Sequence, residues 1–174
     1  MRPGDRLVEL GCGTARNLIR IARRYPEAKL FGLDASRAML ETASEAVRRA
    51  GLETRIGLAH GYAEDLSPAM FGQDEAFDAC VFSYSLSMIP DWKQALTAAS
   101  AALSESGRIH IVDFGDLGGL GGAGRAILLA WLRLFHVTPR VELLHTFERN
   151  NSAALRVLPG RYAFLLTDQR GNLF

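Results

Sequence analysis

Short apolar or β-branched runs alternate with longer segments of helical periodicity along the chain as far as Asp113. This alternation is typical of βαβ units, and it predicts a parallel sheet with helices on both faces. The five predicted strands are Arg6–Leu10, Lys29–Leu33, Thr54–His60, Phe77–Ser83 and Gly107–Asp113. Capping residues and the glycines or prolines that follow them place the helices at Thr14–Arg24, Ser36–Ala50 and Asp91–Leu103.

After the fifth strand the pattern changes. Gly115–Gly124 is rich in glycine and is predicted to be a mobile active-site loop. An apolar helix at about Ala126–His136 follows it, and a short helix runs from Pro139 to about Asn150. Two further strands, joined by Pro159 and Gly160, are predicted at Ala153–Leu158 and Arg161–Thr167. The expected fold is therefore α/β and Rossmann-like, with a mostly parallel seven-stranded sheet that ends in an antiparallel hairpin.

Composition narrows the class of protein. A chain of 174 residues with 48% hydrophobic residues fits one domain, taken as 1–174. A formal net charge of +1 argues against a nucleic-acid partner. Two cysteines, Cys12 and Cys80, suggest reduced thiols and neither a disulfide framework nor a metal site. Without a signal peptide or an apolar run of about 20 residues, a cytoplasmic location is expected.

The first strand runs into the sequence Glu9-Leu10-Gly11-Cys12-Gly13-Thr14. Gly11 permits a tight turn, Gly13 lets a ligand approach the backbone, and the next helix offers free N–H groups. A dinucleotide fingerprint would need a further glycine where Arg16 stands, and Glu9 would repel a pyrophosphate. An acid beside exposed amides instead matches the ammonium and carboxylate of S-adenosylmethionine.

Asp34 ends the second strand about 20 residues beyond these glycines, where a carboxylate can accept hydrogen bonds from both hydroxyls of a ribose. The alternative, a helix cap, is disfavoured because Ser36 already fills that position. With the strand order, the glycine loop and Asp34, the chain resembles the class I S-adenosylmethionine-dependent methyltransferases. It departs from them at Ala15, where many members have a third glycine.

That resemblance implies S-adenosylmethionine as the cofactor and adenine contacts at the end of the third strand. Tyr62 stands where an acid is usual, so it either stacks on the adenine or is a plain surface tyrosine. The predicted cofactor-binding residues are Glu9, Gly11, Cys12, Gly13, Thr14, Asp34, Ala35, Tyr62, Ala63 and Ser83.

Three further segments are more specific than the glycine loop: Ser83–Trp92, His110–Asp116 and Trp131–Arg140. They resemble the betaine-lipid methyltransferases, which trimethylate the amino group of diacylglyceryl homoserine. The resemblance implies an N-methyltransferase that acts on a lipid headgroup.

Direct methyl transfer depends mainly on positioning and on exclusion of water. The carboxyl ends of the fourth and fifth strands supply Tyr84 and Asp113, which are predicted to be catalytic. The predicted acceptor-binding residues are Ser85, Asp116, His136 and Arg140. The alternatives are a solvated loop for the acids and a helix cap for His136, while His110 is expected to be structural.

The helix from Ala126 presents Ile127, Trp131 and Leu134 on one face and Arg125 and Arg133 on another. It is expected to be buried, with contact to an anionic membrane as the alternative; the protein would then be peripheral at the inner membrane surface.

Three other functions remain open from the sequence. They are a methyltransferase for a soluble small molecule, a non-catalytic remnant or partner subunit, and, least favoured, a nicotinamide enzyme. The remnant or partner subunit is considered because few residues precede the first strand, so the lid helices of the family are expected to be missing. A partner subunit or a homodimer would then have to cover the pocket.

Overall fold

The computed structural model describes residues 2–134, 137–149 and 154–169. Its sheet has seven strands in the order β3-β2-β1-β4-β5-β7-β6. The first five in that order are parallel, and β7 runs antiparallel to both β5 and β6. The strands are β1 (Arg6–Leu10), β2 (Lys29–Asp34), β3 (Ile56–His60), β4 (Phe77–Ser83), β5 (Leu103–Phe114), β6 (Leu155–Val157) and β7 (Ala163–Gln169). The predicted mostly parallel sheet with a terminal antiparallel hairpin is confirmed.

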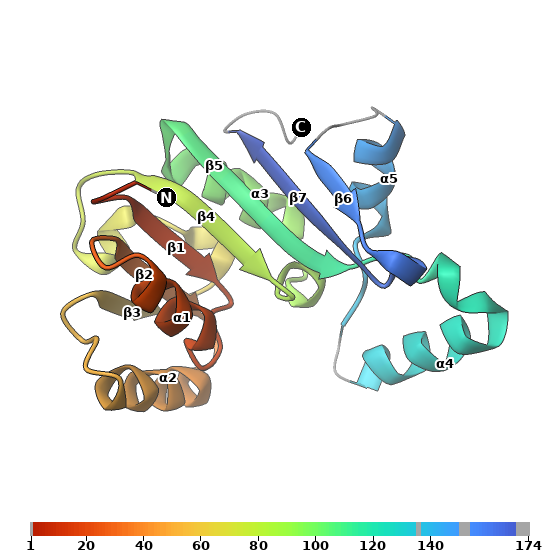
Figure 1. Cartoon of the computed structure of the whole chain (residues 1–174), viewed down its shortest axis with the longest axis horizontal. Helices are drawn as coiled ribbons and strands as arrows, with labels where there is room; N and C mark the ends of the chain where they lie inside the picture. The colour runs from red at the N-terminus through yellow and green to blue at the C-terminus, as the bar shows by residue number, and fades with distance from the viewer. Residues whose placement is uncertain (1, 135–136, 150–153, 170–174) are drawn as a thin grey trace.

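Helices cover both faces of this sheet (Figure 1). They are α1 (Arg16–Arg24), α2 (Arg37–Arg49), α3 (Trp92–Ala102), α4 (Gly121–Leu134) and α5 (Val141–Arg149). The side chains of α1 and α2 form one core with β1 to β3, while α3 and α5 pack on the opposite face in a second core. A third, small cluster around Leu117, Leu132 and Val137 holds α4. Among the described residues, no helix is long and apolar enough to cross a bilayer.

Three of the differences between predicted and observed element boundaries have a local cause in the structure. Leu103 has extended dihedral angles and pairs with Phe77, so α3 ends one residue earlier and β5 starts four residues earlier than expected. The turn at Leu52–Arg55 delays β3 until Ile56. A 3₁₀ turn at Pro159–Arg161 likewise delays β7 until Ala163.

The glycine-rich segment is more regular than predicted. A 3₁₀ turn occupies Gly118–Leu120 and α4 begins at Gly121, inside the expected loop. Leu117 is fully buried, and the Arg125 Nε donates to the Asp116 carbonyl at 2.9 Å. These contacts supply the order that the glycines alone would not, because they tie both ends of the segment to packed residues.

Candidate functional site

A cavity of about 680 Å³ opens at the edge of the sheet where the parallel strands end. Open α/β sheets bind ligands at this edge, since the loops that follow the strands diverge there. Part of its wall is apolar and was not predicted, namely Met39, Met88, Ile89 and Pro90. Eight of the predicted residues line it: Gly11, Gly13, Asp34, Ala35, Tyr62, Ala63, Tyr84 and Ser85.

The glycine loop forms the floor of this cavity. Gly11 has a φ of +72°, and a Cβ there would lie 2.5 Å from the Ser85 Cβ, so only glycine fits. Gly13 has a φ of +53°, but a Cβ there would meet nothing within 4 Å, which leaves its backbone open to a ligand. Ala15 is also left-handed, with a φ of +58°, immediately before α1. It adopts the conformation that the third glycine of the family would adopt at lower cost.

Asp34 ties the glycine loop to the end of β2. Its Oδ2 accepts from the Gly13 amide at 2.7 Å and its Oδ1 from the Ser36 amide at 2.8 Å. Ser36 is the actual cap of α2, because its Oγ accepts from the Met39 amide at 3.3 Å. A carboxylate has about four acceptor positions, so Asp34 keeps acceptor capacity at the cavity wall after both contacts.

Glu9 lies behind the loop and is only 1% exposed. Its Oε1 accepts from the Asn17 Nδ2 at 2.8 Å, whereas its Oε2 is buried and has no hydrogen-bond partner among the described residues. Burial raises the pKa of Glu9 to about 7, with the nearby Asp34 adding to the rise and the Asn17 hydrogen bond opposing it. A buried carboxylate oxygen without a partner is costly, and a bound cation would remove that cost.

Asn17 is a polar residue near the site that the sequence interpretation also missed. Besides Glu9, its Nδ2 contacts the Ser83 Oγ at 3.1 Å. Ser83, predicted to touch the cofactor, makes this partly buried contact and is not on the cavity wall. The sequence feature that could have identified Asn17 was its position in the first turn of α1, the helix that follows the glycine loop.

Two other loop residues do not face the cavity. Cys12 is buried, and burial together with two nearby carboxylates raises the pKa of its thiol to about 12, which keeps the thiol neutral. Thr14 is exposed and lies in a separate surface groove between α1 and α2, beside Arg16 and Arg20. Neither side chain is placed to contact a ligand in the cavity.

Tyr84 stands at the end of β4 in a strained conformation, with a φ of +54°. Its amide donates to the Val112 carbonyl at 2.8 Å, and its ring meets the Phe114 ring edge-on at a centroid distance of 5.0 Å. Partial burial raises the pKa of its phenol, so the hydroxyl is protonated at neutral pH. Left-handed backbone at a tyrosine is unfavourable and persists where surrounding contacts impose it, often at functional sites.

Ser85 lines the cavity, but its hydroxyl is already used. The Oγ donates to the Leu10 carbonyl at 2.6 Å, and the residue is buried. This contact joins β1 to the 3₁₀ turn η3 (Leu86–Met88), which carries part of the apolar wall. Ser85 thus shapes the cavity instead of offering a group to an acceptor.

Asp113, predicted to be catalytic, and Arg140, predicted to bind the acceptor, support η3 from behind. Asp113 is fully buried, and its two oxygens accept from the amides of Ser87 at 2.8 Å and Phe114 at 2.7 Å. Burial raises the pKa of Asp113, against the opposing effect of those hydrogen bonds and of Arg140. The Arg140 guanidinium donates to the carbonyls of Leu86 and Ile89. In the structure both residues therefore hold η3 in place and neither lines the cavity, so their roles toward an acceptor stay predictions.

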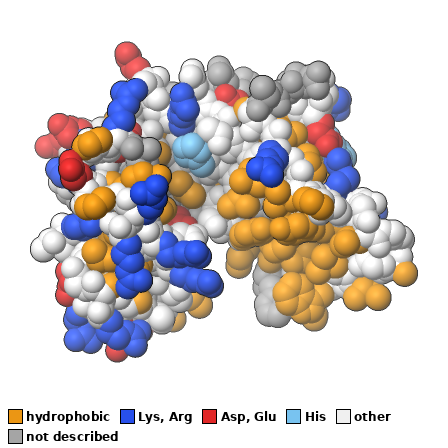
Figure 2. All heavy atoms as spheres, viewed as in Figure 1, with side chains coloured by type: hydrophobic (Ala, Val, Ile, Leu, Met, Phe, Trp, Pro, Cys, Tyr) orange, Lys and Arg blue, Asp and Glu red, His pale blue; other side chains and the backbone are white. Residues whose placement is uncertain are grey.

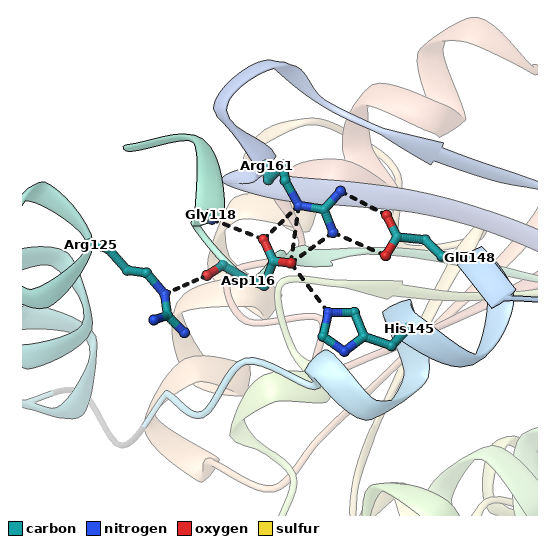
Figure 3. A network of polar contacts seen from close by, with 6 residues as sticks. All are labelled: Asp116, Gly118, Arg125, His145, Glu148 and Arg161. Carbon is teal, nitrogen blue, oxygen red and sulfur yellow. Dashed lines mark hydrogen bonds and ion pairs between the residues drawn. The ribbon is translucent and has the colours of Figure 1, made fainter. Parts of the chain in front are cut away.

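Asp116 also lies away from the cavity, in the network of Figure 3. Arg161 contacts its carboxylate at 2.7 to 3.0 Å and pairs on the other side with Glu148. The Gly118 amide and His145 complete the shell around Asp116, and the Arg161 hydrogen bonds hold its pKa well below the usual range. Asp116 joins the segment before α4 to α5 and to the turn before β7, so the prediction that it binds the acceptor is not supported.

The two histidines singled out from the sequence have separate outcomes. His110 contacts the Thr167 Oγ1 across β5 and β7 at 3.1 Å, and burial lowers its pKa, as suits a structural residue. His136 lies outside the described residues, so its predicted acceptor contact stays a prediction.

Comparison with known proteins identifies the family of this chain. Residues 7–107 match the family model described as a methyltransferase domain. The chain is 30% identical over 110 residues to a demethylmenaquinone methyltransferase of Bacillus cytotoxicus, covering 63% of this chain and 44% of that protein. It is 33% identical over 106 residues to a trans-aconitate 2-methyltransferase of Variovorax paradoxus, covering 61% and 37%. The chain thus spans less than half the length of these curated relatives.

Solved structures share the fold. The YcgJ protein of Bacillus subtilis superposes with a TM-score of 0.67 at 22% identity, covering 89% of this chain and 63% of that chain. The S-adenosylmethionine-dependent methyltransferase SibL gives a TM-score of 0.66 at 21% identity, covering 96% and 50%. The [4+2]-cyclase SpnF gives 0.61 at 25% identity, covering 67% and 41%. A fold shared with a cyclase does not decide the reaction, so the chemistry has to be argued from the site.

Proposed function

The chain belongs to the methyltransferase domain family, and from that premise we propose that it binds S-adenosylmethionine in the carboxyl-edge cavity and methylates the amine of a lipid headgroup. The observation that carries the proposal is the pair of carboxylates at the glycine loop, with Glu9 buried behind it and Asp34 hydrogen-bonded to the Gly13 amide at the cavity wall. When bound, the cofactor supplies an electrophilic methyl group on a sulfonium.

The residues present fit this cofactor. The buried Glu9 Oε2, which has no hydrogen-bond partner among the described residues, suits the ammonium of the methionine part, and the open Gly13 backbone lets that part approach. Asp34 has acceptor capacity for the two ribose hydroxyls. Tyr62 is 63% exposed at the cavity wall beside Ala63, where an adenine could stack on its ring. The negative charge of Glu9 next to the glycine loop disfavours a dinucleotide pyrophosphate at this position.

The acceptor side of the cavity combines one polar group with an apolar rim. The protonated Tyr84 hydroxyl can accept a hydrogen bond from an amine N–H and so aim the nitrogen lone pair at the methyl group. Met88, Ile89 and Pro90 exclude water and suit the apolar part of an acceptor. In the transfer step the new N–C bond forms as the S–C bond breaks, a thioether leaves, and the nitrogen loses a proton to solvent.

The lipid amine is the more specific part of the proposal. It is supported by the apolar rim and by the resemblance of Ser83–Trp92, His110–Asp116 and Trp131–Arg140 to the betaine-lipid enzymes. The two curated relatives, by contrast, are named for quinone and trans-aconitate acceptors. A second candidate is a soluble small acceptor, which the likeness to the trans-aconitate enzyme favours. The two acceptors differ in whether an apolar chain is needed for activity.

An assay with methyl-labelled S-adenosylmethionine tests the proposal. We expect label to enter diacylglyceryl homoserine in detergent micelles but neither free homoserine nor trans-aconitate. Tyr84→Phe removes one neutral hydrogen bond, so we expect kcat to fall about tenfold while cofactor affinity stays unchanged. Labelling of a soluble acceptor would support the second candidate, and labelling of no acceptor by cofactor-bound protein would contradict methyl transfer to either.

A further inference from the structure

Helix α4 is apolar around most of its circumference, yet only Leu132 of its fourteen residues is buried. Leu128 and Leu129 pack beside Leu132 in the small cluster that holds the helix. The opposite face points outward, with Ile127 72%, Trp131 52% and Leu134 76% exposed. A helix that is apolar on both sides normally has a partner on both sides.

The exposed face continues beyond the helix. Figure 2 shows hydrophobic side chains gathered over α4 and the adjoining part of the sheet. Leu120, Tyr162 and Leu165 are each about 40% exposed there, and a Cβ at Gly160 would lie 3.6 Å from Leu120. We call these residues, together with Ile127, Trp131 and Leu134, the α4 patch. Its extent exceeds the scattered apolar side chains of an ordinary surface.

The charged residues of α4 itself are two arginines, Arg125 and Arg133. The acids Asp116 and Glu148 beside the turn before β7 are both paired with Arg161. Arg133 is exposed and is the neighbour of Leu134 in the chain. Arg156 pairs in register with Leu165, so Arg156 and Leu165 lie on the same face of the hairpin. Apolar and tryptophan side chains beside arginines suit the headgroup region of an anionic bilayer.

The patch is held in a defined place relative to the cavity. The Asp116 network fixes the segment before α4 to α5 and to the turn before β7 (Figure 3). Phe114 packs on the cluster under α4 and also meets Tyr84, which lines the cavity. In Figure 1, α4 projects beyond the end of β5, at the carboxyl edge of the parallel strands. A surface bound through α4 would thus lie next to the acceptor side of the cavity.

We infer that the α4 patch docks the protein on an anionic lipid bilayer. The docking would bring a headgroup to the cavity, and in that respect the inference rests on the proposed function. Docking depends only on the exposure and charge of the α4 patch, so the docking inference and the proposed function can fail separately.

Vesicle binding tests the inference. We expect the protein to sediment with phosphatidylcholine vesicles that contain phosphatidylglycerol and much less with phosphatidylcholine alone. In a Trp92→Phe background Trp131 is the only tryptophan, and its emission should shift to the blue on binding. Ile127→Ser with Leu134→Ser should weaken binding at least about tenfold, because both side chains leave the contact. Tyr25→Ser, a change at an exposed aromatic residue outside the α4 patch, should have no effect.

Charge reversal gives a second matched pair. Arg133→Glu should weaken binding about tenfold at low salt, whereas Arg48→Glu on α2 should leave it nearly unchanged. No binding to anionic vesicles, or equal loss in the matched controls, would overturn the inference. Self-association that the Ile127 and Leu134 changes abolish, without vesicle binding, would replace the bilayer with a second copy. Calorimetry with S-adenosylmethionine on the same variants tests the cofactor site separately from bilayer docking, because none of these changes touches the cofactor site.

Discussion

Asp34→Ala is expected to weaken binding of S-adenosylmethionine by more than about a hundredfold. The change removes both acceptors proposed for the ribose hydroxyls and releases the Gly13 amide from its 2.7 Å contact. Hydrogen bonds to a charged group contribute about 1.5–3 kcal/mol each, and a factor of ten corresponds to about 1.4 kcal/mol. Isothermal titration calorimetry measures the change directly.

The matched control is Asp74→Ala, which removes an exposed carboxylate that does not line the cavity. It should bind the cofactor with the affinity of the unmodified protein. Thermal melting of both variants checks that the folded state survives, because Asp34 also accepts from the Ser36 amide at the start of α2. Equal affinity in folded Asp34→Ala and Asp74→Ala would refute the ribose assignment.

Glu9→Gln is expected to raise stability while it lowers cofactor affinity. The pKa of Glu9 is about 7 in the folded chain and 4.5 as the ordinary value, so the folded state binds more protons between these limits. The contribution of Glu9 to stability is therefore fully present below about pH 4.5 and is lost as the pH rises through about 7. Above that pH the buried charge destabilises the cofactor-free protein, and glutamine removes it.

At pH 8 we expect Glu9→Gln to be more stable than the unmodified protein by about 1–3 kcal/mol in denaturant unfolding. Its affinity for S-adenosylmethionine should fall at least about tenfold, since an amide replaces the charge opposite the ammonium. Glu53→Gln, at an exposed glutamate, should change neither quantity. A Glu9→Gln protein that is less stable at pH 8, or that binds the cofactor as before, would contradict the role assigned to Glu9.

Much of the fold could be predicted because strand and helix periods are local properties of the chain. The start of α4 could not, since its order depends on the Arg125 contact with the Asp116 carbonyl and on the burial of Leu117. Glycines alone favour a loop there. Side-chain contacts of this kind are not visible in the periodicity of hydrophobic and polar residues.

The cofactor side of the site was easier to predict than the acceptor side. Gly11, Gly13 and Asp34 lie at spacings that the strand–loop–helix geometry imposes, and all three line the cavity. The burial of Asp113 could have been predicted from the alternation of β5, because Asp113 shares a face with Ile109 and Ile111 and all three are buried. The contacts of Arg140 could not be predicted, because its partners, the carbonyls of Leu86 and Ile89, are more than fifty residues away.

The most direct test of the central claim is amide chemical-shift mapping of the ¹⁵N-labelled protein with S-adenosylhomocysteine. If the carboxyl-edge cavity is the cofactor site, saturable shifts should be largest at Gly11, Gly13, Ala35 and Ala63, which line it. A second cavity of about 640 Å³, lined by Arg108 and His110 among others, lies at the opposite end of the strands. Shifts confined to that end, or no saturable shifts at all, would contradict the account.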